Sequence, residues 1–320
     1  SQLDDLINVA INPCSFAGQT DCTSQTGRRS FLSGGREIDV DQDVHSLFFE
    51  TAMDISEDID LQLAVRYEDY GDATTFDPKL AGRYVINDMF TLRGSVQTTF
   101  RGPDIDSLSP NAVTGLSYVG PTAAFKAIDA VGNPDLEPEQ AFTYNVGAVM
   151  NFTDNLTVTV DYWNYDFDNP IVVEDFNALV TAYAGGGAAK AAVQEQIFCT
   201  GAGNDGSCAA SGIERIVVQS VNGPSIETSG VDLFVNYTLD SSVGQFSFGA
   251  DFSHTLQYEQ DEYEKNGAVV QEAYDAAGFL NAGRGARPLP DTKGRVFGEY
   301  TLENHNFLLY VNHTSEYEDE

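Results

Sequence analysis

Residues 142 to 152 alternate between two kinds of side chain. The apolar positions are Phe142, Tyr144, Val146, Ala148, Met150 and Phe152, and the positions between them are Thr143, Asn145, Gly147, Val149 and Asn151. A period of two predicts a β-strand. At about 3.3 Å per residue this strand spans roughly 36 Å, well beyond the usual globular strand of 5–6 residues. The chain must therefore cover one long apolar face, although its formal net charge is −33.

The same alternation recurs along the chain. It is clear in residues 59–67, 90–101, 156–162, 231–239 and 246–252, and fainter in 47–53, 80–86, 296–302 and 307–311. Short turns are expected at 56–58, 87–88, 153–155, 240–244 and 303–306, and long connections at 101–140, about 172–213 and about 255–290. Only residues 70–77 form a link of intermediate length. Strands with short links on one side and long links on the other are typical of an antiparallel up-and-down transmembrane β-barrel.

The segment 213–239 decides whether short and long links keep alternating along the chain. If 213–222 and 229–239 were separate strands joined at Gly223-Pro224, the turn at 240–244 would fall on the long-link side. A single strand over 214–239, irregular near Gly223-Pro224 and projecting beyond the membrane in its first half, restores the alternation. We therefore expect ten strands in the chain.

The composition narrows the class of protein. Lys and Arg total 16 against 49 Asp and Glu, so the chain lacks the basic face that a nucleic-acid partner requires. It is 42% hydrophobic and so is not a disordered acidic tail. No window of about 18 apolar residues predicts a transmembrane helix, whereas a barrel strand needs only 9–11 residues. The alternative is a soluble β-sandwich with one buried face.

Aromatic residues on the apolar faces gather near the predicted strand ends. They are Tyr67, Phe90, Phe100, Phe152, Tyr162, Tyr237 and Phe246. Rings at the boundary between water and lipid are typical of barrel girdles. The opposite faces carry Arg, Gln, Asp, Thr and Asn, which suit a solvated lumen. We therefore expect the apolar side to face lipid.

The four cysteines form two close pairs, Cys14 with Cys22 and Cys199 with Cys208. Both pairs lie in polar, turn-rich segments without a neighbouring histidine, which disfavours a metal site. Two loop disulfides formed in an oxidising compartment are favoured over four free thiols.

Known catalytic and cofactor motifs are missing from the sequence. It contains no GxSxG, HExxH or Walker motif, and no GxGxxG motif after a strand. The histidines His45, His254, His305 and His313 are scattered. We therefore predict no enzyme, no catalytic residue, no metal ligand and no cofactor. Residues 185–198 suggest a short helix within a long connection.

Five segments, taken in order, resemble the TonB-dependent outer-membrane receptors. They are LQLAVRYEDYGD (61–72), LRGSVQTTFRGPDIDSL (92–108), GNPDLEPEQAFTYNVGAVMNF (132–152), IETSGVDLFVNYTL (226–239) and RPLPDTKGRVFGEYTL (287–302). They are similar to that family's Arg-Tyr-x-x-Tyr, Phe-Arg-x-Pro, Asn-Pro-x-Leu-x-Pro-Glu, Gly-Val-Asp/Glu and Leu-Pro motifs. Gly102 stands where the second motif more often has Ala.

The resemblance implies a 22-stranded barrel with a plugged lumen. The family's plug, energy-coupling box and terminal aromatic strand have no counterpart in this sequence. We therefore expect the chain to be part of a longer protein, with residues 1–43 as an extracellular loop segment and residues 44–320 as an incomplete barrel portion.

The resemblance also implies a function. A receptor of this kind imports a scarce nutrient such as a ferric siderophore, vitamin or oligosaccharide, energised by the TonB-ExbB-ExbD system, across a Gram-negative outer membrane whose lipid and lipopolysaccharide surround it. Ligand contacts are expected in the long loops and the upper lumen, at Arg101, Asp104, Tyr118, Trp163, Tyr165, Arg284 and Arg287. The acid excess disfavours a strongly anionic ligand. The alternative is a secreted acidic β-rich adhesin domain that binds carbohydrate or calcium.

Overall fold

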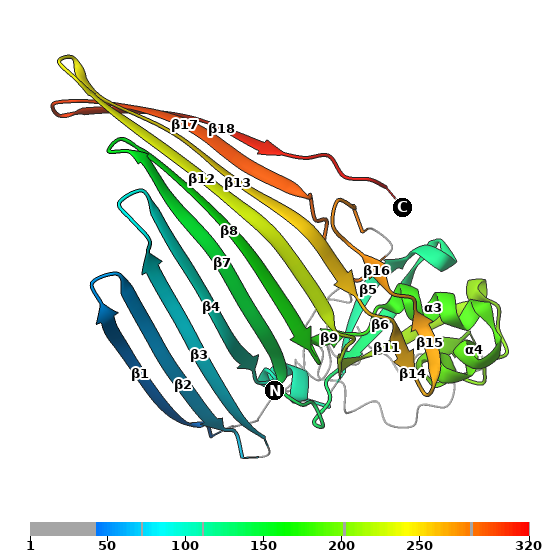
Figure 1. Cartoon of the computed structure of the whole chain (residues 1–320). Coiled ribbons are helices and arrows are strands. Elements are labelled where there is room, and N and C mark those ends of the chain that lie inside the picture. Colours follow the sequence, from blue (N-terminus) through cyan, green and yellow to red (C-terminus); the bar gives the residue numbers. More distant parts are fainter. Residues whose placement is uncertain (1–42, 72, 111, 201–202, 282–283, 320) are drawn as a thin grey trace, which may run out of the picture.

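The computed structural model describes residues 43–71, 73–110, 112–200, 203–281 and 284–319. Its main feature is one curved antiparallel sheet (Figure 1). The ten long strands of this sheet lie in the order β1 (His45–Ser56), β2 (Ile59–Asp69), β3 (Thr74–Val85), β4 (Phe90–Arg101), β7 (Glu139–Thr153), β8 (Leu156–Asp168), β12 (Ile226–Ser241), β13 (Gly244–Gln260), β17 (Thr292–Leu302) and β18 (His305–Thr314). The short strand β16 (Tyr274–Asp275) pairs with β13. The predicted count of ten barrel strands is confirmed.

The predicted short turns all connect neighbouring strands of this sheet, which places them at the same end of it (Figure 1). Turn chemistry explains where the strands reverse. The Asn87 side-chain oxygen accepts hydrogen bonds from the backbone N–H groups of Met89 and Phe90, both at 2.9 Å. Glu303, in the last of these turns, has a φ of 48°. We call this the short-turn end of the sheet.

The three long connections fold together at the opposite end, and we call their folded part the loop lobe (Figure 1). The first contributes α2 (Ile105–Leu108), β5 (Val113–Val119), η1 (Gly120–Thr122) and β6 (Ala124–Val131). The second contributes β9 (Ile171–Val173), α3 (Phe176–Gly185), α4 (Gly187–Val193), η2 (Gln194–Gln196), β10 (Ile197–Cys199), η3 (Ala210–Gly212) and β11 (Ile213–Asn222). The third contributes the hairpin β14 (Tyr263–Lys265) and β15 (Ala268–Gln271).

The loop lobe has its own small sheet and hydrophobic core. The sheet order is β10-β11-β6-β5, with β9 also paired to β11, and the β11–β6 pair is parallel. All three connections supply core residues, which are Val119, Ile128, Leu179, Val180, Ala182, Tyr183, Ala192, Val193, Ile197, Ile213, Ile216, Val218 and Val270. Burial of this apolar surface is what joins three segments that lie far apart in the sequence.

A disulfide between Cys199 and Cys208 closes a short loop beside this core. The Cα atoms are 5.8 Å apart, and the Tyr183 hydroxyl donates a hydrogen bond to the Cys208 carbonyl at 2.9 Å. The predicted local pairing of these two cysteines is confirmed. Cys14 and Cys22 lie outside the described residues.

The prediction of one strand over 214–239 is wrong. Residues 213–222 form β11 inside the loop lobe, and only β12 belongs to the barrel sheet. The chain turns between them, where the Gly223 N–H donates to the Pro170 carbonyl at 2.7 Å. Both halves alternate in the sequence. In β11, Ile216 and Val218 face the core of the loop lobe. In β12, successive residues face the two sides of the barrel sheet. The alternation therefore could not tell which sheet each half joins.

The long connections contain more regular structure than the sequence suggested. The short helix expected within 185–198 is confirmed by α4, whereas α3 was not predicted. Asp175 is the N-cap of helix α3, and its carboxylate accepts from the Asn177 N–H at 2.7 Å. Among the described residues, no helix has the length and apolar character to cross a membrane.

Candidate ligand-binding site

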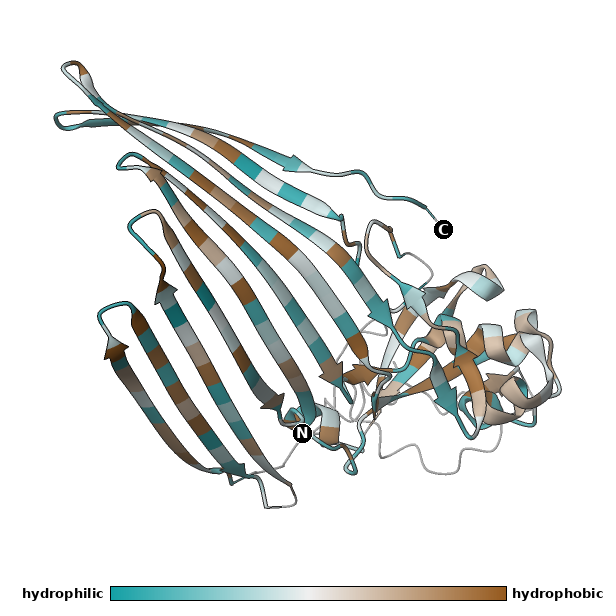
Figure 2. Cartoon of the chain, viewed as in Figure 1, coloured by the Kyte–Doolittle hydropathy of each residue, from teal (hydrophilic) through white to brown (hydrophobic). Residues whose placement is uncertain are grey.

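The barrel sheet has two faces of opposite character, which appear as alternating bands along its strands (Figure 2). The cross-strand pairs keep apolar residues together on one face, as in Leu92 with Ala148 and Ala148 with Val160. On the other face, Ser95 pairs with Asn145 and Asn145 pairs with Trp163. The predicted faces therefore coincide with the two sides of the sheet, and we call the polar side the inner wall.

Exposed aromatic rings mark two levels on the apolar face. Phe90 and Phe152 meet edge to face near the short-turn end, with centroids 6.5 Å apart. Phe142 and Tyr144 lie toward the loop lobe, with centroids 6.2 Å apart. Ten residues separate Phe142 from Phe152 on β7, which corresponds to about 33 Å along a strand and about 25 Å along the barrel axis at a tilt near 40°. This matches the height of the apolar band of outer-membrane barrels.

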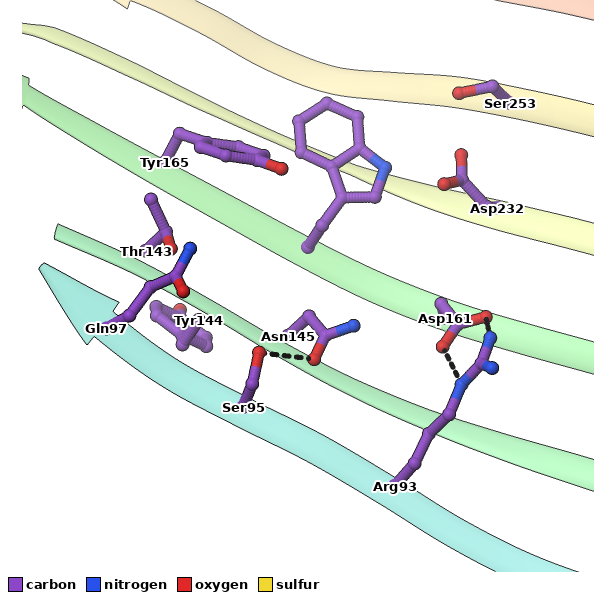
Figure 3. Close-up of a pocket in the computed structure, with 11 residues that line it drawn as sticks. Arg93, Ser95, Gln97, Thr143, Tyr144, Asn145, Asp161, Tyr165, Asp232 and Ser253 are labelled. Atoms are coloured by element: carbon purple, nitrogen blue, oxygen red, sulfur yellow. Dashed lines mark hydrogen bonds and ion pairs between the residues drawn. The ribbon is translucent and has the colours of Figure 1, made fainter. Parts of the chain in front are cut away.

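The inner wall contains a hollow of about 540 Å³ across β4, β7, β8, β12 and β13 (Figure 3). Its lining is almost entirely polar or aromatic and includes Ser95, Gln97, Asn145, Trp163, Tyr165 and Asp232. The Ser95 hydroxyl donates to the Asn145 side-chain oxygen at 3.1 Å, so these two side chains hold each other in place. Each of these residues comes from the strand face that the alternation assigned to the lumen.

An arginine–aspartate pair borders the hollow on the side toward the short-turn end (Figure 3). The Arg93 guanidinium donates to both oxygens of Asp161, at 2.8 and 2.6 Å. The two strands that carry them are separated by β7, and Gly147 lies between them in register. A Cβ atom at Gly147 would lie 1.9 Å from the Asp161 Oδ1 atom. The absence of a side chain at 147 is therefore what lets the pair close.

Three aromatic side chains follow one another along β8 on the inner wall. The ring centroids of Trp163 and Tyr165 are 5.8 Å apart, and those of Tyr165 and Phe167 are 6.1 Å apart with planes inclined by 10°. The indole of Trp163 lies against Gly230 of β12, where an added Cβ would be 2.3 Å from its Cζ2 atom. We call these three residues the aromatic ladder. It leads from the hollow toward the loop lobe.

Asp232 contributes an acceptor that lacks a partner. It lies opposite Asp161 on β8 and Ser253 on β13. Its Oδ1 atom is buried and has no hydrogen-bond partner among the described residues. A buried carboxylate oxygen of this kind is costly unless it is satisfied, and the rest of the Asp232 side chain is only partly buried where it lines the hollow.

The seven residues predicted to meet a ligand divide among several places. Trp163 and Tyr165 line the hollow together. Arg101 ends β4 and is paired with Glu139 through two hydrogen bonds of 2.7 and 2.8 Å, and Asp104 precedes α2. Tyr118, on β5, is exposed and packs edge to face on Phe125, with centroids 5.6 Å apart.

The two remaining predicted residues belong to the third long connection. The Arg284 guanidinium lies over the rings of Tyr274 and Phe279, at 4.8 and 5.6 Å from their centroids. Arg287 is exposed, and its backbone carbonyl accepts from the Asn281 side chain at 2.9 Å. The structure thus brings Trp163 and Tyr165 together in the hollow, whereas these two arginines do not line it.

Sequence reasoning missed most of the hollow. The alternation predicts a lumen-facing position, but not a binding site, for Ser95, Gln97, Asn145 and Asp232. Phe167 was also missed, although its position four residues after Trp163 on a strand places it on the same face. The signal that could have found them is the pairing of strands, which a single sequence does not supply.

A buried glutamate joins the parts of the loop lobe. The Glu174 carboxylate accepts hydrogen bonds from the Tyr263 hydroxyl at 2.8 Å and from the Gln219 backbone N–H at 3.0 Å, and it also forms a salt bridge with Lys265. These contacts tie the β14–β15 hairpin to β11. Burial, together with the adjacent Glu174 charge, raises the pKa of Tyr263 above the ordinary tyrosine value.

Within the described part of the chain, no cluster of three or more His, Cys, Asp or Glu side chains is arranged to hold a metal ion. The aromatic and polar side chains that line the hollow can bind a solute by stacking and hydrogen bonding. The position of the hollow on the inner wall of the barrel strands suits a site that holds a solute.

Comparison with known proteins identifies the family. The family described as "TonB dependent receptor-like, beta-barrel" matches residues 15–319. The probable TonB-dependent siderophore receptor PirA of Acinetobacter baumannii is 22% identical over 152 residues, which are 47% of this chain and 20% of that receptor.

Solved structures share the fold. A variant of the ferric enterobactin receptor PfeA of Pseudomonas aeruginosa matches 84% of this chain and 32% of its own, with a TM-score of 0.54 and 14% identity. The siderophore receptor PirA of Acinetobacter baumannii matches 86% of this chain and 34% of its own, with a TM-score of 0.52 and 15% identity. The chain thus spans about a third of the length of these structures.

The family match extends over nearly the whole chain and agrees with the curved antiparallel sheet, the asymmetric ends and the two faces described above. Members of this family are transport receptors, and their barrels are outer-membrane proteins. The chain belongs to the TonB-dependent receptor family and forms part of its β-barrel.

Proposed function

We propose that the protein carrying this chain is a Gram-negative outer-membrane receptor that binds a scarce nutrient and imports it with energy supplied through TonB. The nutrient belongs to the ferric siderophores, vitamins or oligosaccharides. The observation that carries this proposal is the family match over residues 15–319. The polar inner wall and its polar hollow support it, because a receptor needs a site that can hold a solute.

The proposal assigns an orientation and partners. The loop lobe lies outside the cell, and the short-turn end faces the periplasm. The apolar face meets outer-membrane lipid and lipopolysaccharide. An N-terminal segment outside this chain contacts the TonB-ExbB-ExbD system. In this scheme residues 44–320 form the barrel portion together with the loop lobe. The predicted extracellular loop segment, residues 1–43, lies outside the described residues except for its last residue.

The proposal retains all seven predicted ligand-contacting residues. Trp163 and Tyr165 contact the solute within the hollow. Arg101, Asp104, Tyr118, Arg284 and Arg287 contact it earlier, at the rim and on the loop lobe. Arg101 acts there as a pair with Glu139, because the two hydrogen bonds between them neutralise both charges.

Uptake by whole cells tests the function. A deletion strain is compared with its parent for growth on single iron sources, vitamins and oligosaccharides supplied at limiting concentration, and the comparison is repeated without TonB. We expect one nutrient class to require both genes. Growth that requires this protein but not TonB contradicts active transport. A protein released into the medium in soluble form supports the adhesin alternative instead.

A further inference from the structure

The aromatic ladder is built as a surface rather than as core packing. Its three residues alternate with outward-facing residues on β8, so their rings lie in one column on the inner wall. Tyr165 is 41% exposed and so presents its ring to the hollow. The centroid spacings of 5.8 and 6.1 Å are comparable with the length that one hexose adds to a glycan chain.

Uncharged polar side chains flank the ladder on the β4 and β7 side. Gln97 pairs with Thr143, which pairs with Tyr165. One level closer to the short-turn end, Ser95 pairs with Asn145, which pairs with Trp163. Amides and hydroxyls both donate and accept hydrogen bonds, so this strip can match the hydroxyl groups of a polyol.

On the other side of the ladder, β12 supplies the polar side chains of Thr228 and Asp232, with Gly230 between them. Thr228 and Gly230 of β12 pair with Tyr165 and Trp163. The buried Oδ1 atom of Asp232 supplies an acceptor without a partner among the described residues. A column of rings between two hydrogen-bonding strips can hold a ligand whose flat faces are apolar and whose edges carry hydroxyls.

Four arginines of the inner wall, on β2, β3 and β4, are held in ion pairs, whereas Arg295 of β17 bonds the Asn312 side chain at 3.0 Å. Arg83 is paired with Asp60 at 2.7 Å, Arg93 with Asp161 at 2.6 Å and Arg101 with Glu139 at 2.7 Å. Arg66 is paired with Glu68. Lys79 belongs to the same register row as Tyr165 but is three strand spacings away, or about 14 Å. Asp232 lies one pair from Trp163 along β12, and the lysines nearest the track are Lys79, opposite Gln97, and Lys293, opposite Ser253.

We propose that the aromatic ladder and its flanking strips form a binding track for a neutral oligosaccharide. The proposal rests on the import function proposed above and narrows its substrate class. The apolar faces of successive sugar rings stack on Trp163, Tyr165 and Phe167. Their hydroxyl groups exchange hydrogen bonds with Gln97 and Asn145, and one hydroxyl donates to Asp232. An anionic ferric chelate finds no unpaired arginine on this part of the wall.

Direct binding to the full-length protein, purified in detergent, tests the track. The probes are maltoheptaose, cellohexaose and xylohexaose, with ferric enterobactin as the anionic contrast. Affinity is measured by calorimetry and by fluorescence. Trp163 is the single tryptophan of this chain, so the difference between the native protein and a Trp163→Phe variant isolates its signal. We expect at least one of the oligosaccharides to bind and to change that signal.

Matched variants locate the site. Tyr165→Ala and Phe167→Ala should each weaken binding of that oligosaccharide about three- to tenfold, as expected for the loss of one stacking ring. Tyr162→Ala removes a ring from the same strand on the lipid face and should leave the affinity unchanged. Heat-modifiable gel mobility confirms that each variant forms its barrel.

Four results would overturn the proposal: no binding of any of the three oligosaccharides, equal loss in the Tyr165 and Tyr162 variants, no loss in the Tyr165 variant, or binding of ferric enterobactin alone. Growth tests keep this outcome separate from the import function. TonB-dependent uptake of a ferric chelate that is insensitive to Tyr165→Ala would contradict the oligosaccharide track but would agree with the proposed receptor function. Uptake that does not need TonB would contradict the proposed receptor function itself.

Discussion

At the scale of single residues, neighbouring positions of one strand meet different solvents. Val158 pairs with Met150 and Val235 on the apolar face, whereas Thr159 points to the inner wall. Val158→Arg should impair insertion, because an arginine on the lipid side near mid-membrane costs about 2–4 kcal/mol. Thr159→Arg should be far milder. The amount of heat-modifiable protein in outer-membrane fractions measures both effects, and equal damage from the two variants would argue for a sheet buried on both faces.

The inner wall has no room for a side chain at Gly147. A methyl group there would occupy the place of the Asp161 carboxylate and separate it from Arg93. Gly147→Ala should lower the unfolding free energy by about 1–2 kcal/mol, a modest value because Arg93 is half exposed. Urea unfolding in lipid vesicles measures the loss.

Gly298→Ala is the matched control for that substitution. Its added Cβ would lie 3.6 Å from the nearest atom of Phe248, which is ordinary van der Waals contact. The control variant should unfold at the urea concentration of the native protein. Equal shifts for the two glycine variants would show that strand propensity, rather than the Arg93–Asp161 pair, sets the effect at position 147.

At the scale of elements, the loop lobe depends on a few contacts between its segments. The Tyr263 hydroxyl donates to Glu174, and burial raises the pKa of Tyr263 above that of an unfolded tyrosine. The protonated phenol therefore stabilises the lobe below about pH 10, and this contribution is lost as the pH rises above 10. Hydrogen exchange of the β14–β15 hairpin should accelerate more between pH 8 and 10.5 than the chemical exchange rate explains.

The Tyr263→Phe variant checks the origin of that pH dependence. It retains the ring and removes the group that titrates. We expect its hairpin to exchange faster at pH 8 than that of the native protein, with no additional loosening above pH 10. A native-like alkaline response in this variant would assign the effect to another group of the lobe.

The disulfide between Cys199 and Cys208 closes a loop with eight intervening residues. Chain-entropy estimates for loops near this size give roughly 2–3 kcal/mol of local stabilisation. Replacing both cysteines with serine should make the lobe more sensitive to protease and weaken ligand binding, while insertion of the barrel is unchanged. Protease digestion of intact cells, followed by measurement of barrel mobility, separates the two effects. Loss of the barrel itself would contradict a local role.

At the scale of the whole molecule, the two ends of the barrel sheet differ in chemistry. One end carries tight turns, and the other carries a folded lobe with a disulfide, which suits an oxidising exterior (Figure 1). A cysteine placed at the exposed Glu264 of the lobe should react with a membrane-impermeant maleimide in intact cells. A cysteine at Asp154, in a short turn, should react only after lysis. Labelling of position 154 from outside would reverse the proposed orientation.

The barrel strands could be predicted from the sequence because the side-chain pattern of each strand reflects the environments of its own two faces. A residue such as Val158 belongs to the apolar face whichever strand lies beside it, so the alternation of two along one segment is enough to assign its faces. The short turns carry local signals too, such as Asn87, whose side chain caps its own turn. The strand count, the apolar face and the local pairing of Cys199 with Cys208 follow from features of this kind.

The loop lobe and the hollow were decided only by the tertiary structure. Ile216 alternates with polar neighbours as a barrel residue does, but it faces a core supplied by three segments that the sequence keeps far apart. The hollow likewise exists because register places Ser95, Asn145 and Trp163 side by side on three strands. Contacts between distant segments depend on which strand pairs with which and on burial shared among them, and no single stretch of sequence contains that information.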